Sequence, residues 1–190
     1  MEPLTIDRSR TALVVIDLQK FFLSMETHPY DAKTVISNSA SLASAFRKNR
    51  MPVFLVHASP TRDAAPKPQA DSPFAPRGEL PQGWADIVPE LGPEPEDVLV
   101  VKRQWGAFYG TDLELRLRRG GFDTIVLCGI ATTYGVESTA RFAYEFGFQQ
   151  VFAEDAMSDM SAEAHKSSVD FVLKRIGRIR PTSDILNALK

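Results

Sequence analysis

Short apolar runs alternate with helix-like patterns along most of this 190-residue chain. Apolar side chains recur at helical spacing over 32–46, as they do in other segments between the runs. Alternation of this kind implies parallel strands joined by right-handed crossovers, with helices on both faces of the sheet. It therefore predicts a three-layer α/β/α fold around a mostly parallel six-stranded sheet. The expected strands are 12–16, 53–56, 97–101, 124–127, 151–153 and 178–180.

Capping residues and glycines set the expected ends of several helices. Ser161 is predicted to cap a helix that ends near Gly177, and Ser183 to cap the last helix. The fifth strand is expected to end before Glu154 and Asp155. In the helix after Thr133, the residues expected on the buried side are Val136, Ala140, Ala143 and Phe146.

The segment 59–93 interrupts the alternation. It contains eight prolines, too many for a central strand or a long helix. Its second half carries Trp84, Ile87, Val88 and Leu91, which predict that this half packs against the rest of the protein. We therefore expect one domain over 1–190, with a Pro-rich loop or insertion at about 59–93.

Composition excludes several classes of function. The chain has 22 basic and 24 acidic residues, a net charge of -2, which argues against a nucleic-acid-binding surface. No apolar run approaches the roughly 20 residues of a membrane span, and the amino terminus lacks a secretory signal pattern. A single cysteine fits a reducing compartment, so we expect a cytoplasmic protein.

Polar groups follow three of the predicted strands. Asp17 comes after the first strand, Lys102 after the third, and the loop 132–135 after the fourth. Singly these are weak signals, because such an Asp often forms a turn and a Lys is usually solvated. The carboxyl ends of parallel strands share one edge, where open α/β sheets bind ligands. Together, the three groups predict a site at that edge.

The same segments carry a family resemblance. They are LVVIDLQ at 13–19, VVK at 100–102, FYGTDL at 108–113, GIAT at 129–132, ESTAR at 137–141 and DA at 155–156. This set resembles the isochorismatase-like hydrolases, which include cysteine amidases such as nicotinamidases and carbamoylsarcosine amidases. The resemblance implies a Rossmann-like hydrolase of a small molecule, with no cofactor, that assembles as a dimer or larger homo-oligomer.

The resemblance also assigns roles to individual residues. In the cysteine members an Asp, a Lys and a Cys form the catalytic triad. Asp17 and Lys102 match the first two positions, and Gly135 stands at the position of the Cys. The Ala131–Thr132 peptide matches a cis non-proline bond of the family, whose backbone amides help to build an oxyanion site.

Cys128 is a poor substitute for the missing thiol. It lies at the end of the fourth strand between apolar neighbours, with no cation placed to lower its pKa. We interpret it as a buried core residue. A thiol-based covalent mechanism is therefore not expected.

The resemblance further implies a substrate pocket. Amidase members can bind a divalent metal through histidines and an Asp near the second strand, but here the loop after His57 contains no histidine. A lone His does not make a metal site, so we predict no metal and place His57 in the pocket wall. The other expected pocket residues are Gln19, Phe22, Trp105, Phe108 and Tyr134. For Phe108, packing in the core is an equally good explanation.

Gly135 narrows the chemistry without naming the substrate. Isochorismatases of this family also have glycine there, and they hydrolyse an enol-ether bond without a covalent intermediate. Asp17 would then be the acid, helped by an anionic substrate whose carboxylate neutralises Lys102. Three interpretations stay open: an enol-ether hydrolase, a hydrolase of another bond such as an amide that uses Asp17-activated water, and a catalytically silent ligand-binding protein.

Overall fold

The fold is known from a computed structural model that describes residues 3–58, 69–72, 80 and 82–190. Within these described residues, six parallel strands form one sheet in the order β3-β2-β1-β4-β5-β6. In this doubly wound order, successive strands are added on one side of β1 up to β3 and on its other side from β4 onward. Open α/β sheets place ligands at such a switch point, here between β1 and β4. The predicted parallel sheet is confirmed. The strands are β1 (Thr11–Ile16), β2 (Val53–Ala58), β3 (Val98–Lys102), β4 (Thr124–Ile130), β5 (Gln149–Ser158) and β6 (Arg178–Arg180).

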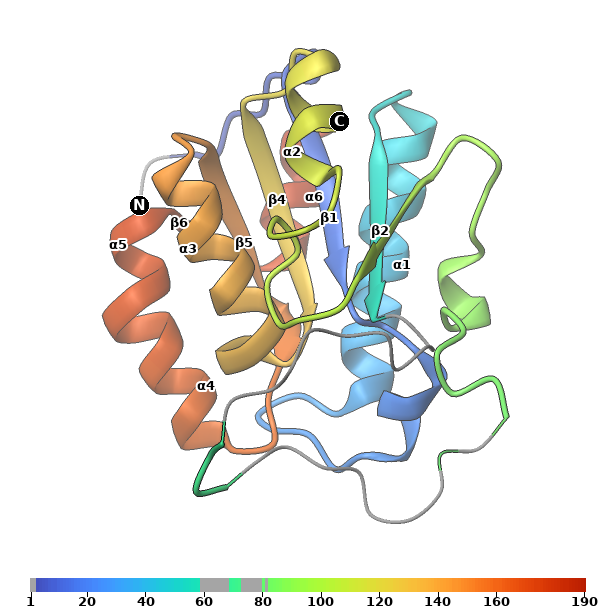
Figure 1. The fold of residues 1–190 in the computed structure, drawn as a ribbon. Coiled ribbons are helices and arrows are strands. Elements are labelled where there is room, and N and C mark those ends of the chain that lie inside the picture. Colours follow the sequence, from blue (N-terminus) through green and yellow to red (C-terminus); the bar gives the residue numbers. More distant parts are fainter. Residues whose placement is uncertain (1–2, 59–68, 73–79, 81) are drawn as a thin grey trace.

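Helices cover both faces of the sheet. The α-helices α1 and α6 pack together and against β5 on one face, whereas α3 packs against β5 from the other (Figure 1). The α-helices are α1 (Ala32–Lys48), α2 (Leu113–Arg119), α3 (Glu137–Glu145), α4 (Ala162–Ser168), α5 (Lys174–Ile176) and α6 (Thr182–Ala188). Single turns of tighter or wider helix are η1 (Lys20–Ser24), η2 (Pro89–Leu91), η3 (Thr132–Val136) and η4 (Val169–Leu173).

The sequence pattern explains why α1 and α4 begin where they do. The Asp31 side chain accepts a hydrogen bond from the Thr34 amide at 2.7 Å and so caps α1. The Ser161 hydroxyl accepts one from the Ala164 amide at 3.2 Å, which confirms the predicted cap of α4. One stripe of α1 is buried against the sheet: Ala32, Val35, Ile36, Ser39, Leu42, Ala43 and Phe46.

The expectation that the fifth strand ends before Glu154 is wrong. The register with β4 passes from Leu127 opposite Phe152 to Gly129 opposite Met157, so two steps along β4 correspond to five along β5. The extra residues bulge out of the ladder, after which pairing resumes and the strand continues to Ser158. A sequence pattern that looks for alternation ends the strand where the bulge begins.

The bulge also explains the start of the last helix. The expected Ser183 cap is wrong, because α6 already begins at Thr182 after Pro181. Asp155 Oδ1 accepts hydrogen bonds from the amide and the hydroxyl of Thr182, both at 2.6 Å. A carboxylate from β5 thus replaces the local cap that the sequence suggested.

Two further expectations concern the core: one, the packing of the Pro-rich segment, is confirmed, and the other, the burial of Phe146, is wrong. Val88 and Leu91 are buried, so the second half of the Pro-rich segment does pack, whereas 59–68, 73–79 and 81 lie outside the described residues. Phe146 is 37% exposed because α3 ends at Glu145, one residue before it. None of the helices described is both long and apolar enough to span a membrane.

Candidate active site

Asp17 and Lys102 meet at the carboxyl edge of the sheet. Lys102 Nζ lies 2.6 Å from Asp17 Oδ2, and the two side chains are only 4% and 9% exposed. Lys102 Nζ also donates to the carbonyl of Gln104 at 3.1 Å. The strand-end argument explains this pairing, because Asp17 follows β1, Lys102 ends β3, and β2 lies between these two strands.

The Asp17 carboxyl group is buried and only half satisfied. Asp17 leaves β1 with a left-handed backbone (φ 53°), and its amide donates to the Val56 carbonyl at 2.9 Å. Its second oxygen, Oδ1, is buried and has no hydrogen-bond partner among the described residues. Burial raises the pKa of Asp17 above its ordinary value of 3.8, although the neighbouring Lys102 ammonium acts in the opposite direction.

Gly135 packs directly against this carboxyl group. A Cβ atom at Gly135 would lie 2.9 Å from Asp17 Oδ2 and 2.8 Å from Ile16 Cγ2. Both distances are shorter than ordinary van der Waals contact, and both atoms are held in place, one by Lys102 and one by the core. The carboxyl group therefore occupies the space that a side chain at this position would need.

The loop before Gly135 contains a cis peptide bond, one residue earlier than expected. The cis bond joins Ile130 to Ala131, so the predicted Ala131–Thr132 position is wrong. The Ala131 carbonyl accepts from the amides of Tyr134 and Val136 at 3.1 and 3.2 Å. The Ala131–Thr132 peptide is thus already the first one of the helical turn η3.

Two carboxylate-linked contacts hold η3, and sequence reasoning missed both. Asp159 Oδ2 accepts from the amide and the hydroxyl of Thr133 at 2.6 and 2.7 Å. Thr132 Oγ1 lies 2.9 Å from His165 Nδ1, and His165 Nε2 lies 3.2 Å from Glu154 Oε1. These partners come from β5 and the region that follows it, and only their burial with polar neighbours in the fold identifies them.

Thr139 joins the loop after β3 to the Gly135 turn. Its hydroxyl donates to the Gly135 carbonyl at 2.6 Å and accepts from the Ala107 amide at 3.0 Å. The Trp105 carbonyl lies 3.5 Å from the place of a Gly135 Cβ, so this clamp brings the segment 105–107 over the site. Sequence reasoning missed Thr139 as well, since a threonine inside a helix gives no such signal.

Trp105 and Tyr134 form an aromatic pair beside the Gly135 turn. Their rings meet edge to face with centroids 4.8 Å apart. Trp105 is 56% exposed, so this pair connects the buried Asp17 region to the surface. The pocket role that the resemblance implies for them stays a prediction.

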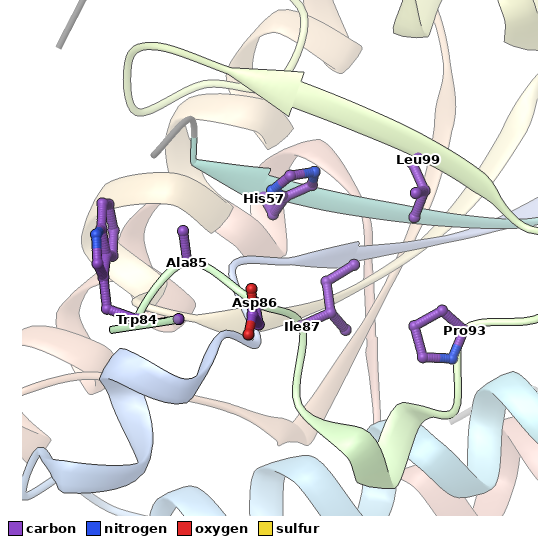
Figure 2. A pocket seen from close by; sticks show the side chains of 8 residues that line it. His57, Trp84, Ala85, Asp86, Ile87, Pro93 and Leu99 are labelled. Atoms are coloured by element: carbon purple, nitrogen blue, oxygen red, sulfur yellow. The ribbon is translucent and has the colours of Figure 1, made fainter. Parts of the chain in front are cut away.

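His57 lies in a separate hollow of about 520 Å³ at the end of β2. Figure 2 shows its ring between β3, which contributes Leu99, and the segment that carries Ala85, Asp86 and Ile87. His57 Nδ1 is buried and has no hydrogen-bond partner among the described residues. Burial lowers the pKa of His57 and outweighs the opposing effect of the Ala58 backbone, and the Lys102 charge acts in the same direction as burial.

Two other predicted pocket residues, Gln19 and Phe108, have different surroundings. Both ends of the Gln19 amide are used: Oε1 accepts from the Ala58 amide at 2.9 Å, and Nε2 donates to the Ala85 carbonyl at 2.8 Å. Gln19 thus ties β2 to the Pro-rich segment instead of facing a ligand. Phe108 is 5% exposed and packs on Phe146 and Phe148, so its predicted pocket role is replaced by core packing.

Phe22 and Cys128 complete the candidates from the sequence. Phe22, in η1, packs against Phe21 with centroids 5.3 Å apart and against the core. Cys128 is completely buried beside the Ser39 hydroxyl, and burial raises its pKa to about 12. It is therefore a core residue, as expected, and no nucleophile. In the described part of the chain, no three His, Cys, Asp or Glu side chains gather as a metal site would require.

Comparison with known proteins identifies the family of the chain. Residues 11–184 match the isochorismatase domain. The isochorismatase family proteins YecD of Escherichia coli O157:H7 and YwoC of Bacillus subtilis (strain 168) are 50% identical over 188 residues and 47% identical over 192 residues. These alignments cover 98% and 100% of this chain and 100% of each relative.

A solved structure extends the similarity to three dimensions. An isochorismatase family protein from Burkholderia thailandensis superimposes with a TM-score of 0.92 at 40% sequence identity, over 99% of both chains. The Asp17–Lys102 pair thus lies within a fold shared along its whole length with that protein. The chain belongs to the isochorismatase family and is an isochorismatase-like hydrolase.

Proposed function

We propose that this hydrolase cleaves an enol-ether bond of the isochorismate type in a small anionic metabolite, with Asp17 as general acid. The observation that carries the proposal is the packing of Gly135 against the buried Asp17 carboxyl group, which leaves no room for a thiol. A probable isochorismatase from Pseudomonas chlororaphis supports it, at 26% identity over 182 residues, 96% of this chain and 87% of that protein.

Protonation of the vinyl carbon starts the reaction. Asp17 Oδ2 is held by Lys102, so the unpartnered Oδ1 is the oxygen that can carry the proton. Transfer of that proton to the terminal vinyl carbon gives an oxocarbenium ion, and water adds to its cationic carbon. On addition, water loses one proton, which restores the acid. As the hemiketal collapses, its C–O bond to the ring breaks, the proton of its hydroxyl passes to the departing ring oxygen, and the products are the ring alcohol and pyruvate.

The Asp17–Lys102 pair links acid strength to the charge of the substrate. A free Lys102 ammonium favours the ionised carboxylate, which opposes the acid role. A substrate carboxylate beside Lys102 would offset this charge and favour protonated Asp17. The site should therefore prefer an anionic substrate over a neutral enol ether of the same size.

The same ion pair favours a second candidate function. An Asp17 kept ionised by Lys102 suits a general base that activates water towards an amide or similar bond. The two functions predict opposite pH dependences. Activity that requires protonated Asp17 falls as pH rises through its raised pKa, whereas activity that requires the carboxylate rises over the same range.

Pyruvate release tests the proposal directly. Purified protein is given isochorismate, and pyruvate is measured by coupling to lactate dehydrogenase across a pH series, with chorismate as a second substrate. We expect release from isochorismate that declines with increasing pH. Hydrolysis of amides with a rising profile would support the base mechanism, and isochorismate binding without turnover would support a silent ligand-binding protein.

Lys102→Met provides a prediction with a defined sign. Removal of the ammonium removes the charge that lowers the Asp17 pKa, so the declining limb of the kcat profile should move to higher pH. KM for isochorismate should rise about tenfold or more, because a charged partner of the substrate carboxylate is lost. A limb that moves to lower pH would contradict the acid role of Asp17.

Three further properties stay predictions. They are a homo-oligomeric assembly, a cytoplasmic location and a single domain over residues 1–190. Size-exclusion chromatography with light scattering checks the first, with a dimer or larger species expected.

A further inference from the structure

A hydrogen-bonded chain of polar side chains, buried at Thr132 and His165 and partly exposed at Glu154 and Tyr30, leads from the η3 turn to the start of α1. Thr132 Oγ1, His165 and Glu154 are linked as described above, and Glu154 Oε2 accepts from the Tyr30 hydroxyl at 2.8 Å. Thr132 and His165 are 0% and 3% exposed. These hydrogen-bonded side chains therefore connect four segments: η3, α4, the β5 bulge and the residues before α1.

The hydroxyl–imidazole–carboxylate order resembles a nucleophilic triad, yet its surroundings argue against that use. A nucleophile must be free to attack the substrate, whereas the completely buried Thr132 hydroxyl is already hydrogen-bonded to His165 Nδ1. Thr132 Oγ1 also lies 3.1 Å from the Ser158 carbonyl, a second partner within the core. The group is thus enclosed by protein, and its effect must pass through the backbone of Thr132.

The carboxylate end of this hydrogen-bonded chain orients the His165 ring. The hydrogen bond from His165 lowers the pKa of Glu154, and Tyr30, whose pKa burial raises to about 12, is a neutral donor to it. An ionised carboxylate only accepts, so His165 Nε2 must carry a proton. This bond orients the ring and keeps Nδ1 directed at Thr132, as carboxylates do for histidines that must hold one orientation.

We propose that Glu154 and His165 are positioning residues that hold Thr132, and through it the η3 turn, so that Gly135 stays packed against Asp17. Thr132 begins η3, and Gly135 is the fourth residue of that turn. Asp159 holds the next residue, Thr133, so the turn is fastened at two successive positions. The kinetic consequence rests on the proposed function, while the structural consequence does not.

Amide hydrogen exchange tests the structural part. In Thr132→Val and His165→Ala, the amides of 133–136 should exchange about tenfold faster or more, because local opening becomes easier once one fastening is lost. His165→Asn places an amide group near the former Nδ1 and should recover much of the protection. Thr182→Val is the matched control, since it also removes a buried threonine hydroxyl, here one bonded to Asp155 of β5, and should leave these amides unchanged.

Kinetics test the positioning role itself. In His165→Ala, kcat for isochorismate should fall about tenfold or more with little change in KM, and His165→Asn should recover part of it. Unchanged exchange at 133–136, or equal acceleration in Thr182→Val, would overturn the proposal. Faster exchange with unchanged kcat would overturn it too. Should the wild-type protein lack isochorismate turnover, the proposed function fails and the exchange experiment alone decides this inference.

Discussion

Asp17→Asn should lower kcat for isochorismate by a factor of about 10² to 10⁴, the usual contribution of a positioned general acid. Asparagine has nearly the same shape and keeps an oxygen that can accept from Lys102. It has no carboxylic proton to deliver from the position of Oδ1, the oxygen that is buried without a partner. The steady-state rate of pyruvate release measures the effect. Unchanged turnover would show that Asp17 is not the acid.

A control is needed to separate the loss of the catalytic proton in Asp17→Asn from a general loss of stability. Removing one charge of a buried pair can cost about 3–5 kcal/mol of folding free energy, which could mimic a catalytic defect. Asp97→Asn is a matched control, because Asp97 is 2% exposed and pairs with Arg47 at 2.6 Å on another part of the fold. Denaturant unfolding gives the folded fraction of each variant. Once kcat is expressed per folded molecule, Asp97→Asn should have the wild-type value.

Much of this site follows from strand order alone. Asp17 and Lys102 are 85 residues apart, yet each stands at the carboxyl end of a parallel strand, and the carboxyl ends of such strands share one edge. The strands β1, β2 and β4 are nearly continuous apolar runs in the sequence, because helices cover both faces of these strands. That is why the sheet and a site at its edge with Asp17 and Lys102 could be predicted together.

The parts that could not be predicted depend on local register and on distant partners. The β5 bulge places Glu154 and Asp155 against α4 and α6, and nothing in the composition of 149–158 marks it. Gln19 was expected at the ligand, but its amide is used by backbone groups of β2 and the Pro-rich segment. Such contacts arise from how segments meet, which a linear pattern does not contain.

Gly135→Ala should reduce both activity and stability, because even one methyl group is too large here. The added Cβ would lie 2.9 Å from Asp17 Oδ2 and 2.8 Å from Ile16 Cγ2, so Asp17 must move away from Lys102 or Ile16 must leave its packing. Overpacking of this kind costs about 1–3 kcal/mol of folding free energy. We expect kcat for isochorismate to fall about tenfold to a hundredfold, as misplacement of a catalytic group by about 1 Å can do.

Gly106→Ala is the matched control for this effect. A Cβ at Gly106 would meet its nearest neighbour, Ser138 Cβ, at 3.5 Å, an ordinary contact, although Gly106 follows Trp105 beside the same site. This variant should keep near wild-type kcat and unfolding free energy. Equal losses in the two variants would mean that the Gly135 contact with Asp17 has no special role.

Gly135→Cys should gain no amidase activity, for the same steric reason. Its Sγ would be attached to a Cβ that Asp17 and Ile16 already exclude, so the thiol could enter only by displacing the carboxylate meant to activate it. Without that carboxylate as base, a cysteine of ordinary pKa is mostly protonated near neutral pH and reacts poorly. The measurements are ammonia release from nicotinamide and N-carbamoylsarcosine, together with the rate of thiol alkylation. Amide turnover by this variant, abolished by iodoacetamide, would instead show that the pocket has kept the amidase arrangement and that only the nucleophile is missing.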